Sequence, residues 1–418
     1  AYLQFKRNPV VRELVALYTV DESELTFIVK HARQPSSRLT LAILLKSFQR
    51  LRYFPALDEV PAAVLRHIRT SLKFRIQVKP AQPSAVTLYR YHALIRKHLD
   101  FRPFEEGGLD VAARAMRDAA AIMDHPPDLI NAGIEQLVTD RIGLPAFSTL
   151  DRLARRVRAL VNGQLFVTIA QRLTADEKAR LDGLLQAGGK AGKSPLHEVK
   201  RLPKRSSLRH FQELIDHMER LDALVGTDAP LAGIPELKRK HFAAEARALD
   251  AAELKDFRPA KRHAVLLCLI HRARVQVRDD LAAMFIKRMG KIHAHGKEHL
   301  DRLRSQYREK AEVLVATMSD VIRVLAEQRS DTAAGREIRR LVGQRGSIDT
   351  LQEDCNAIAA HSGDNYLPLL WPYYKSHRPT LLRMVRILNL KSTTEDRSLI
   401  DALELILAQE RQRGDWLE

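Results

Sequence analysis

Four arginines within one predicted helix are the side chains whose type and spacing best define a chemistry in this sequence. Arg152, Arg155, Arg156 and Arg158 lie in residues 148–162 and avoid the apolar positions of that stretch. A guanidinium group binds phosphate oxygens and can form two parallel hydrogen bonds to the edge of a guanine. The pattern predicts nucleic-acid binding, with Arg155 and Arg156 as candidate base or phosphate contacts and Arg152 near the helix tip.

The element that carries these arginines is the second helix of a predicted helix-turn-helix pair within residues 124–162. The turn cannot be helical, because Pro145 has no backbone N–H and disfavours helical geometry at the residue before it. Ser148 then occupies an N-cap position, with Thr149 beside it and Asp151 completing a capping box. The predicted apolar face of the helix is Leu150, Leu153, Val157, Leu160 and Val161. Such a pair places its second helix in the major groove of DNA.

A weaker helix-turn-helix candidate lies within the first hundred residues. Lys46 and Arg50 lie off the apolar face of one predicted helix, and Arg66, Arg69 and Lys73 share a face of the next. A further basic helix over residues 87–99 carries Arg90, Arg96 and Lys97. We expect these cations to bind mainly phosphates and so to fix the register of the protein on a duplex.

A stretch rich in glycine, proline and basic residues covers residues 187–207 and predicts a linker or an arm. Its cations could follow a phosphate backbone; the candidates are Lys200, Arg201, Lys204 and Arg205. A solvated flexible loop explains the same composition equally well.

The positive charge of the chain is concentrated in its first half. The formal net charge is +18 over 418 residues. Residues 1–100 contain 17 Lys and Arg against 7 Asp and Glu, and residues 141–210 contain 15 against 5. Residues 211–418 are nearly balanced, with 34 against 31. A polyanion is the simplest partner for such a distribution, and solubility alone does not require it.

Helical periodicity runs through nearly the whole sequence and predicts an all-α, multi-domain fold. Strand patterns are almost absent: residues 74–78 alternate briefly between apolar and polar side chains but stop before Pro80. Thr174 and Glu177 predict another capping box. Residues 261–328 lack proline and repeat apolar side chains every three and four residues, which predicts one long helix.

This chain is too long for one ordinary domain. We expect a basic helical DNA-binding domain over residues 1–101 and a second DNA-binding domain, with the helix-turn-helix, over residues 102–186. A basic linker over residues 187–207 and a larger helical linker or scaffold domain over residues 208–418 complete the prediction. The chain starts at Ala1 rather than at a methionine, so we expect a piece of a longer protein.

The sequence offers little for catalysis or cofactor binding. His295 and His299 are four residues apart, but no acid stands at the spacing of a zinc enzyme. The acids Asp349, Glu353 and Asp354 have no rigid scaffold on which to hold magnesium, and caps or solvated faces explain them better. No apolar run approaches the ~20 residues of a membrane span. We therefore predict no catalytic residue, metal, cofactor or membrane partner in this chain.

Several long segments resemble the transposases of the Tn-three family of bacterial replicative transposons. The matching runs include PPDLINAGIEQLV, LPAFSTLDRLARRVRALVN, HFAAEARALDAAELKDF and VLLCLIHRARVQVRDDLAAMFIKRM. They continue with SGDNYLPLLWPYYKSHRPTLLRMVRIL and RSLIDALELILAQERQRGDWLE. The resemblance is strongest from residue 101 onward and looser before it.

The resemblance implies the N-terminal portion of such a transposase, which recognises the terminal inverted repeats of the transposon. The family's Asp-Asp-Glu triad and its Mg²⁺ lie in a C-terminal core, and this chain stops before it, so no catalytic residue carries over. We predict sequence-specific binding of double-stranded transposon-end DNA in the bacterial cytoplasm, in association with the nucleoid. The alternatives are a helical scaffold that forms a homodimer and pairs two ends, and a truncated repressor of transposition.

Overall fold

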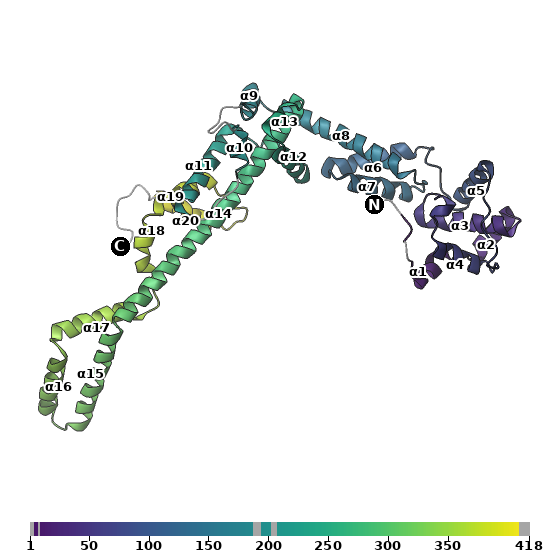
Figure 1. The fold of residues 1–418 in the computed structure, drawn as a ribbon. Coiled ribbons are helices and arrows are strands. Elements are labelled where there is room, and N and C mark those ends of the chain that lie inside the picture. Colours follow the sequence, from purple (N-terminus) through teal and green to yellow (C-terminus); the bar gives the residue numbers. More distant parts are fainter. Residues whose placement is uncertain (1–3, 7–8, 187–193, 202–206, 409–418) are drawn as a thin grey trace. The chain divides into compact units, whose positions relative to one another are not determined.

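Helices make up the regular structure of the described residues. The computed structural model describes residues 4–6, 9–186, 194–201 and 207–408. Within these ranges β-pairing is limited to one isolated bridge between Arg102 and Ile142, and no strand is formed (Figure 1). The predicted all-α, multi-domain fold is confirmed.

The chain divides into two compact units. The first consists of Ala1–Leu196 with Gly226–Arg272, and the second of His197–Val225 with Ala273–Glu418. The four-part division expected from the sequence does not coincide with these units, because residues 226–272 of the expected scaffold domain belong to unit 1, and it stays a prediction.

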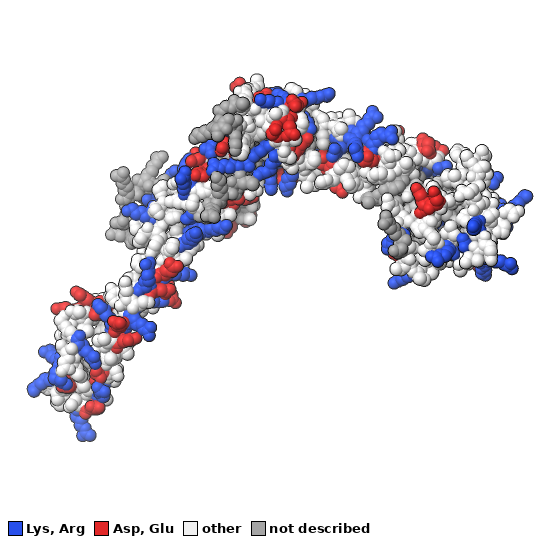
Figure 2. Space-filling view, viewed as in Figure 1, with Lys and Arg blue, Asp and Glu red and all other residues white. Residues whose placement is uncertain are grey.

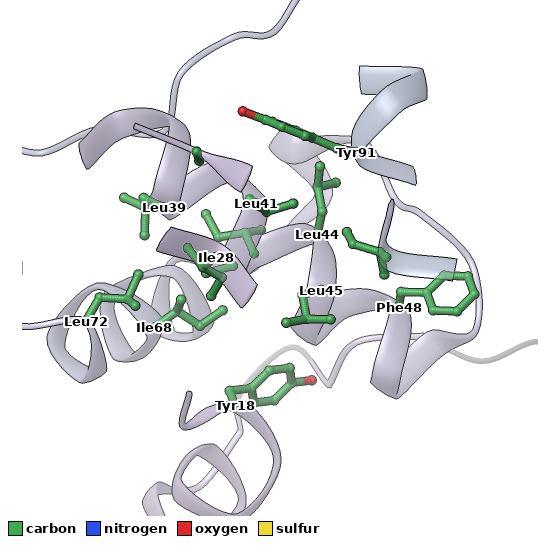
Figure 3. Close-up of a cluster of buried hydrophobic side chains, with 14 of the residues drawn as sticks. Tyr18, Ile28, Leu39, Leu41, Leu44, Leu45, Phe48, Ile68, Leu72 and Tyr91 are labelled. Atoms are coloured by element: carbon green, nitrogen blue, oxygen red, sulfur yellow. The ribbon is translucent and has the colours of Figure 1, made fainter. Parts of the chain in front are cut away.

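The first part of unit 1 is built around one buried helix, α3. It packs against α1, α2, α4 and α5, and nearly all its residues from Leu39 to Phe48 are buried in one apolar cluster (Figure 3). Pro35 starts α3 at a position where the missing N–H is not needed. The elements here are α1 (Val11–Tyr18), α2 (Glu22–His31), α3 (Pro35–Leu51), η1 (Leu57–Glu59), α4 (Ala62–Ser71) and α5 (Ala85–His98).

A three-helix bundle follows, with a separate apolar cluster of its own. Its helices are α6 (Gly108–Ile122), α7 (Pro126–Thr139) and α8 (Phe147–Gln171). Gly133 of α7 allows the close approach of α6, because a Cβ there would lie 2.6 Å from the Met116 Cε atom. The bundle fixes which face of α8 is buried.

Backbone hydrogen bonds anchor the connection between α7 and α8 to the N-terminal helices. The Arg102 N–H donates to the Arg141 carbonyl at 2.8 Å, and the Gly143 N–H donates to the Arg102 carbonyl at 2.9 Å. The Leu144 N–H donates to the carbonyl of Arg52, just after α3, at 2.7 Å. These bonds hold the start of α8 in a defined position within unit 1.

The remainder of unit 1 covers the second half of α8. Phe166 of α8 lies 4.7 Å, ring to ring, from Phe242, and Asp182 contacts Arg262 and His263. The predicted capping box is confirmed: Thr174 Oγ1 accepts from the Glu177 N–H, and Glu177 accepts from the Thr174 N–H. The elements are α9 (Ala175–Gly183), α12 (Glu236–Ala248), α13 (Ala251–Lys255) and the first part of α14 (Pro259–Gln306).

Unit 2 contains the rest of α14 and a hairpin of helices that follows it. The single helix expected over residues 261–328 is two helices, because Tyr307 leaves helical geometry between α14 and α15. The elements are α10 (Leu196–Val199), α11 (Leu208–Leu224), α15 (Arg308–Glu327), α16 (Asp331–Arg345), α17 (Ile348–Ser362), η3 (Leu367–Leu370), α18 (Trp371–Tyr374), α19 (Arg378–Leu388) and α20 (Ser398–Ala408). Among the described helices, none combines the length and the apolar character needed to cross a membrane.

Candidate nucleic-acid interface

Three arginines of α8 lie on the face opposite to its buried side. Leu150, Ala154, Val157 and Val161 are buried in the bundle, whereas Arg152, Arg155 and Arg156 are exposed. A helix turns once every 3.6 residues, so these two sets fall on opposite sides. Leu160 was expected on the apolar face but is 58% exposed. The arginine face is open to a ligand. Within it, Arg155 forms an ion pair with Asp151, with 3.1 Å between the Arg155 Nε and Asp151 Oδ2 atoms.

The start of α8 differs from the expected one. The helix begins at Phe147, and the Thr149 N–H donates to the carbonyl of Ala146, the N-cap residue. Ser148 is therefore an exposed residue of the first turn and not an N-cap, and Asp151 pairs with Arg155 instead of closing a capping box. Tertiary contacts explain this difference. The hydrogen bonds between residues 141–144 and the backbone of Arg102 and Arg52 determine where the segment between α7 and α8 ends and α8 begins.

Arg158 lies at the edge of the arginine face, beside a buried carboxylate. Its Nη1 is 3.6 Å from Asp124 Oδ2, and Asp124 also contacts Lys238, His241 and Asn162. Burial opposes the ionisation of Asp124, but the hydrogen bonds from His241, Lys238 and Asn162 outweigh it and hold its pKa well below the ordinary value. Arg158 thus has a structural partner that Arg152 and Arg156 lack among the described residues.

Lys46 does not lie on a surface, and its expected phosphate contact is wrong. The side chain is buried, and its ammonium lies 2.7 Å from Glu24, a carboxylate of α2 that is buried with it. The same Glu24 oxygen accepts a hydrogen bond from Gln49 at 2.8 Å. A desolvated lysine needs such a partner, and here α2 supplies it inside the N-terminal cluster.

The other predicted cations of α3, α4 and α5 are at least partly exposed. Arg50, Arg66, Arg90 and Lys97 are exposed, and the N-terminal part carries basic side chains along its right and lower edges on the face shown (Figure 2). Arg96 is half-buried, with its guanidinium 5.8 Å from the centre of the Phe54 ring. Arg69 is half-buried too, and its Nη1 donates to the carbonyl of Ile76 at 3.1 Å.

Of the predicted linker cations, two are described. Arg201 lies 3.1 Å from Glu213 of α11, which ties it to a protein carboxylate, and Lys200 is half-buried. Lys204 and Arg205 lie outside the described residues.

Three exposed cations lie between α4 and α5; Lys73 was expected on one helix face with Arg66 and Arg69, whereas sequence reasoning missed Arg75 and Lys79. Lys73, Arg75 and Lys79 flank the apolar residues Phe74, Ile76 and Val78. The spacing of basic residues in KFRIQVK could have identified them, but the alternation of this segment favours a short strand instead. In the described part of the chain, no group of three or more His, Cys, Asp or Glu is arranged to hold a metal ion.

An open cationic helix face on a small bundle, beside a basic N-terminal domain, defines the class of the site: a candidate surface for a polyanion. Comparison with known proteins shows what the chain is similar to. Residues 1–157 match the family described as a domain of unknown function, DUF4158. The transposase for transposon Tn1546 of Enterococcus faecium is 23% identical over 416 residues, which cover 97% of this chain and 41% of the relative.

Two further relatives show the same relationship. The transposase for transposon Tn21 of Escherichia coli is 22% identical over 94% of this chain and 40% of its own length. The transposase for transposon Tn501 of Pseudomonas aeruginosa is 24% identical over 72% of this chain and 30% of its own length. The chain spans about two fifths or less of these relatives. The resemblance to the N-terminal portion of a Tn-three family transposase is confirmed.

Proposed function

We propose that this chain binds the terminal inverted-repeat DNA of a transposon and presents it to a catalytic part that lies outside these 418 residues. The observation that carries the proposal is the exposed row of Arg152, Arg155 and Arg156 on α8, a helix whose opposite face is locked into a bundle. A rigid helix with guanidinium groups on one side fits the major groove of a duplex.

The exposed cations of the N-terminal helices support a second contact on the same DNA. Arg50, Arg66, Arg90 and Lys97 are exposed and spread over α3, α4 and α5, and we assign them to the phosphate backbone. A recognition site longer than one helix can cover needs contacts from a second element. Such a division gives α8 the sequence specificity and gives the N-terminal part much of the affinity.

We assign catalysis to sequence outside these 418 residues. The chain spans about 41% of the Tn1546 relative, and strand transfer with Mg²⁺ would belong to the remaining sequence. End-labelled duplex incubated with this chain and Mg²⁺ should remain uncut. In this proposal the chain binds its DNA at the nucleoid, in the bacterial cytoplasm.

The test compares an α8 variant with a matched control. The double variant Arg155→Ala/Arg156→Ala should weaken binding to a transposon-end duplex by roughly 10-fold or more, because even one good arginine–guanine pair contributes about 1–3 kcal/mol. It should weaken binding to a scrambled duplex much less. The control is Arg336→Ala/Arg339→Ala, which removes two exposed arginines of α16 in the other unit. Fluorescence anisotropy at fixed salt measures both.

Three results are distinguishable in that assay. A selective loss on the end duplex supports base reading by α8. An equal loss on both duplexes assigns the arginines to phosphate contacts alone and rejects sequence reading by this helix. The same loss in the α16 variant rejects a specific surface altogether.

One observation favours a second role, as a scaffold that pairs two copies. Val315, Met318, Ile322 and Leu325 of α15 are each 58% exposed or more and repeat every three and four residues. Val324 and Thr317, which are buried, lie on a different side of the same helix. An unpartnered apolar seam with heptad spacing suits a second copy of the helix.

Charge placement supports an antiparallel pairing of the two seams. Met318 lies six residues after Glu312 and five before Arg323; both are exposed, and they pair within the chain with Arg308 and Asp320. Antiparallel pairing about Met318 would bring Glu312 of one copy to within about one residue of the level of Arg323 of the other. We therefore propose a homodimer through α15 as the scaffold role, compatible with DNA binding by unit 1.

A further inference from the structure

The connection between α4 and α5 holds an ordered turn with an isoleucine at its tip. The Val78 N–H donates to the Arg75 carbonyl at 3.0 Å, which closes a four-residue turn with Ile76 and Gln77 at its two central positions. Ile76 is 75% exposed. A single exposed isoleucine is ordinary on a protein surface. Its position on a fixed turn between cations is what sets this one apart.

The turn is anchored at both sides. Phe74 and Val78 pack against the apolar cluster of the N-terminal helices. At the end of α4, the Phe74 N–H donates to the Arg69 carbonyl at 3.1 Å and the Lys73 N–H donates to the Thr70 carbonyl at 2.9 Å. This is the pair of hydrogen bonds that closes a helix of the Schellman type. The tip therefore projects from a rigid base.

The side chain of Arg69 holds the tip in place. Its Nη1 donates to the Ile76 carbonyl at 3.1 Å, so the guanidinium bridges α4 and the turn. Arg69 was expected to bind phosphate, but this contact makes it a positioning residue. An alternating strand would have placed Ile76 on the same side as Phe74 and Val78, and the turn places it outside instead.

Three cations surround the tip without acidic partners. Lys73, Arg75 and Lys79 are exposed, and none forms an ion pair with an acid in the part of the chain that the structure describes. Cations that are not neutralised by the protein are available to an anionic ligand. An apolar tip between them does not suit phosphates alone, because a phosphate offers an isoleucine nothing to contact.

We propose that residues 73–79 form a minor-groove reading loop, with Lys73 and Lys79 on the two flanking phosphate backbones, Arg75 in the groove and Ile76 as a wedge at a base step. The inference rests on the proposed binding of duplex DNA and adds a second groove to it. Minor-groove binders combine arginine with an apolar side chain inserted between base pairs. A narrow minor groove also attracts arginine through its enhanced negative potential.

The dimensions of the loop favour this groove over the other. The minor groove is about 6 Å wide, which admits a single turn with one apolar side chain, whereas the major groove is wide enough for a helix. An anionic membrane could also receive an isoleucine flanked by lysines. The concentration of charge over the whole first half of the chain, +15 of the total +18, favours a long polyanion.

The experiment uses the full chain and a set of transposon-end duplexes, each carrying one 2-aminopurine at a different step. In wild-type protein, binding should raise 2-aminopurine fluorescence at one step, because a wedge unstacks the bases there. Ile76→Ala should abolish that rise and weaken binding roughly tenfold, without changing the salt dependence. Ile286→Ala, which truncates another exposed isoleucine in unit 2, is the matched control and should change neither.

A second variant tests the cations separately. Lys73→Ala/Lys79→Ala should lower the slope of log affinity against log salt by about two, as for the loss of two phosphate contacts. Replacing G·C pairs by I·C pairs near the responsive step should strengthen wild-type binding, since this removes the amino group from the minor groove and leaves the major-groove pattern largely intact.

The outcomes separate this inference from the function on which it rests. Wild-type protein that binds no duplex rejects the proposed function. A second outcome rejects the reading loop alone. In it, wild-type protein and Ile76→Ala bind the duplex equally well, and 2-aminopurine fluorescence does not rise at any step. Binding of wild-type protein, but not of Ile76→Ala, to vesicles containing phosphatidylserine, with DNA affinity unchanged, also overturns the loop.

Discussion

The ammonium of Lys238 lies 2.6 Å from the Asp124 carboxylate, and the exposed fractions of the two side chains are 0% and 4%. The residues are 114 positions apart, on α12 and in the connection between α6 and α7. Asn162 of α8 completes the network, donating to Asp124 and accepting from Lys238, each at 2.8 Å. The buried ion pair and Asn162 together therefore join α12 to α8, the helix that carries the arginine face.

Removing one partner of this pair should destabilise unit 1. Lys238→Met leaves a buried carboxylate without its main counter-charge, and such a loss costs about 3–5 kcal/mol. Lys240→Met is the control, because Lys240 is on the same helix, half exposed, with a surface partner in Glu236. Urea unfolding followed by circular dichroism measures both. Equal midpoints for the two variants would show that the pair contributes no stability.

The same carboxylate predicts how stability depends on pH. The folded-state pKa of Asp124 is held below its unfolded value, so its contribution is present above the unfolded pKa, about 4, and is lost as pH falls towards the folded pKa. Wild-type protein should therefore lose more stability than Asp124→Asn between about pH 5 and pH 3. Urea midpoints across that range give the comparison. Parallel curves for the two proteins would contradict the assignment.

Sequence reasoning succeeded where the determining contacts are local. Thr174 and Glu177 form their capping box because both residues lie within one helical turn. It failed where contacts with residues distant in the sequence determine the burial of a side chain or the start of a helix. Lys46 is buried because Glu24, on another helix, supplies a carboxylate inside the cluster. The start of α8 is set by hydrogen bonds to Arg102 and Arg52, which no local pattern shows.

The candidate site shows the same division. Helical spacing was enough to place Arg152, Arg155 and Arg156 on an exposed face of α8, because the apolar residues of one helix fix its buried side. The function of Arg69 was not predictable, since its partner is a carbonyl in a turn whose conformation depends on the packing of Phe74 and Val78.

Replacing Lys73 should raise the stability of the fold and lower its affinity for DNA. Its backbone has φ +58°, the left-handed region that favours glycine at a helix end, so Lys73→Gly should stabilise the fold by about 1 kcal/mol. The same change removes a cation of the reading loop and should weaken DNA binding severalfold. Urea unfolding and anisotropy together test this. A variant that gains stability and binds as tightly as wild-type protein would remove Lys73 from the interface.

The seam of α15 predicts the oligomeric state. Met318→Glu places a charge in the middle of the proposed dimer contact and should shift the protein from dimer to monomer in light scattering after gel filtration. Ala316→Glu adds the same charge at another exposed position of α15 and should leave the dimer intact. Wild-type protein that is monomeric at tens of micromolar would reject the scaffold role.

The affinity of the unaltered chain for a transposon-end duplex, measured against a scrambled duplex over a series of salt concentrations, tests the central claim most directly. We predict a linear fall of log affinity with log salt on both duplexes, because phosphate neutralisation releases counterions. We also predict a preference for the end sequence of roughly 10³-fold or more at physiological salt. Affinity that is insensitive to salt, or equal on the two duplexes throughout, would contradict sequence-specific binding by this chain.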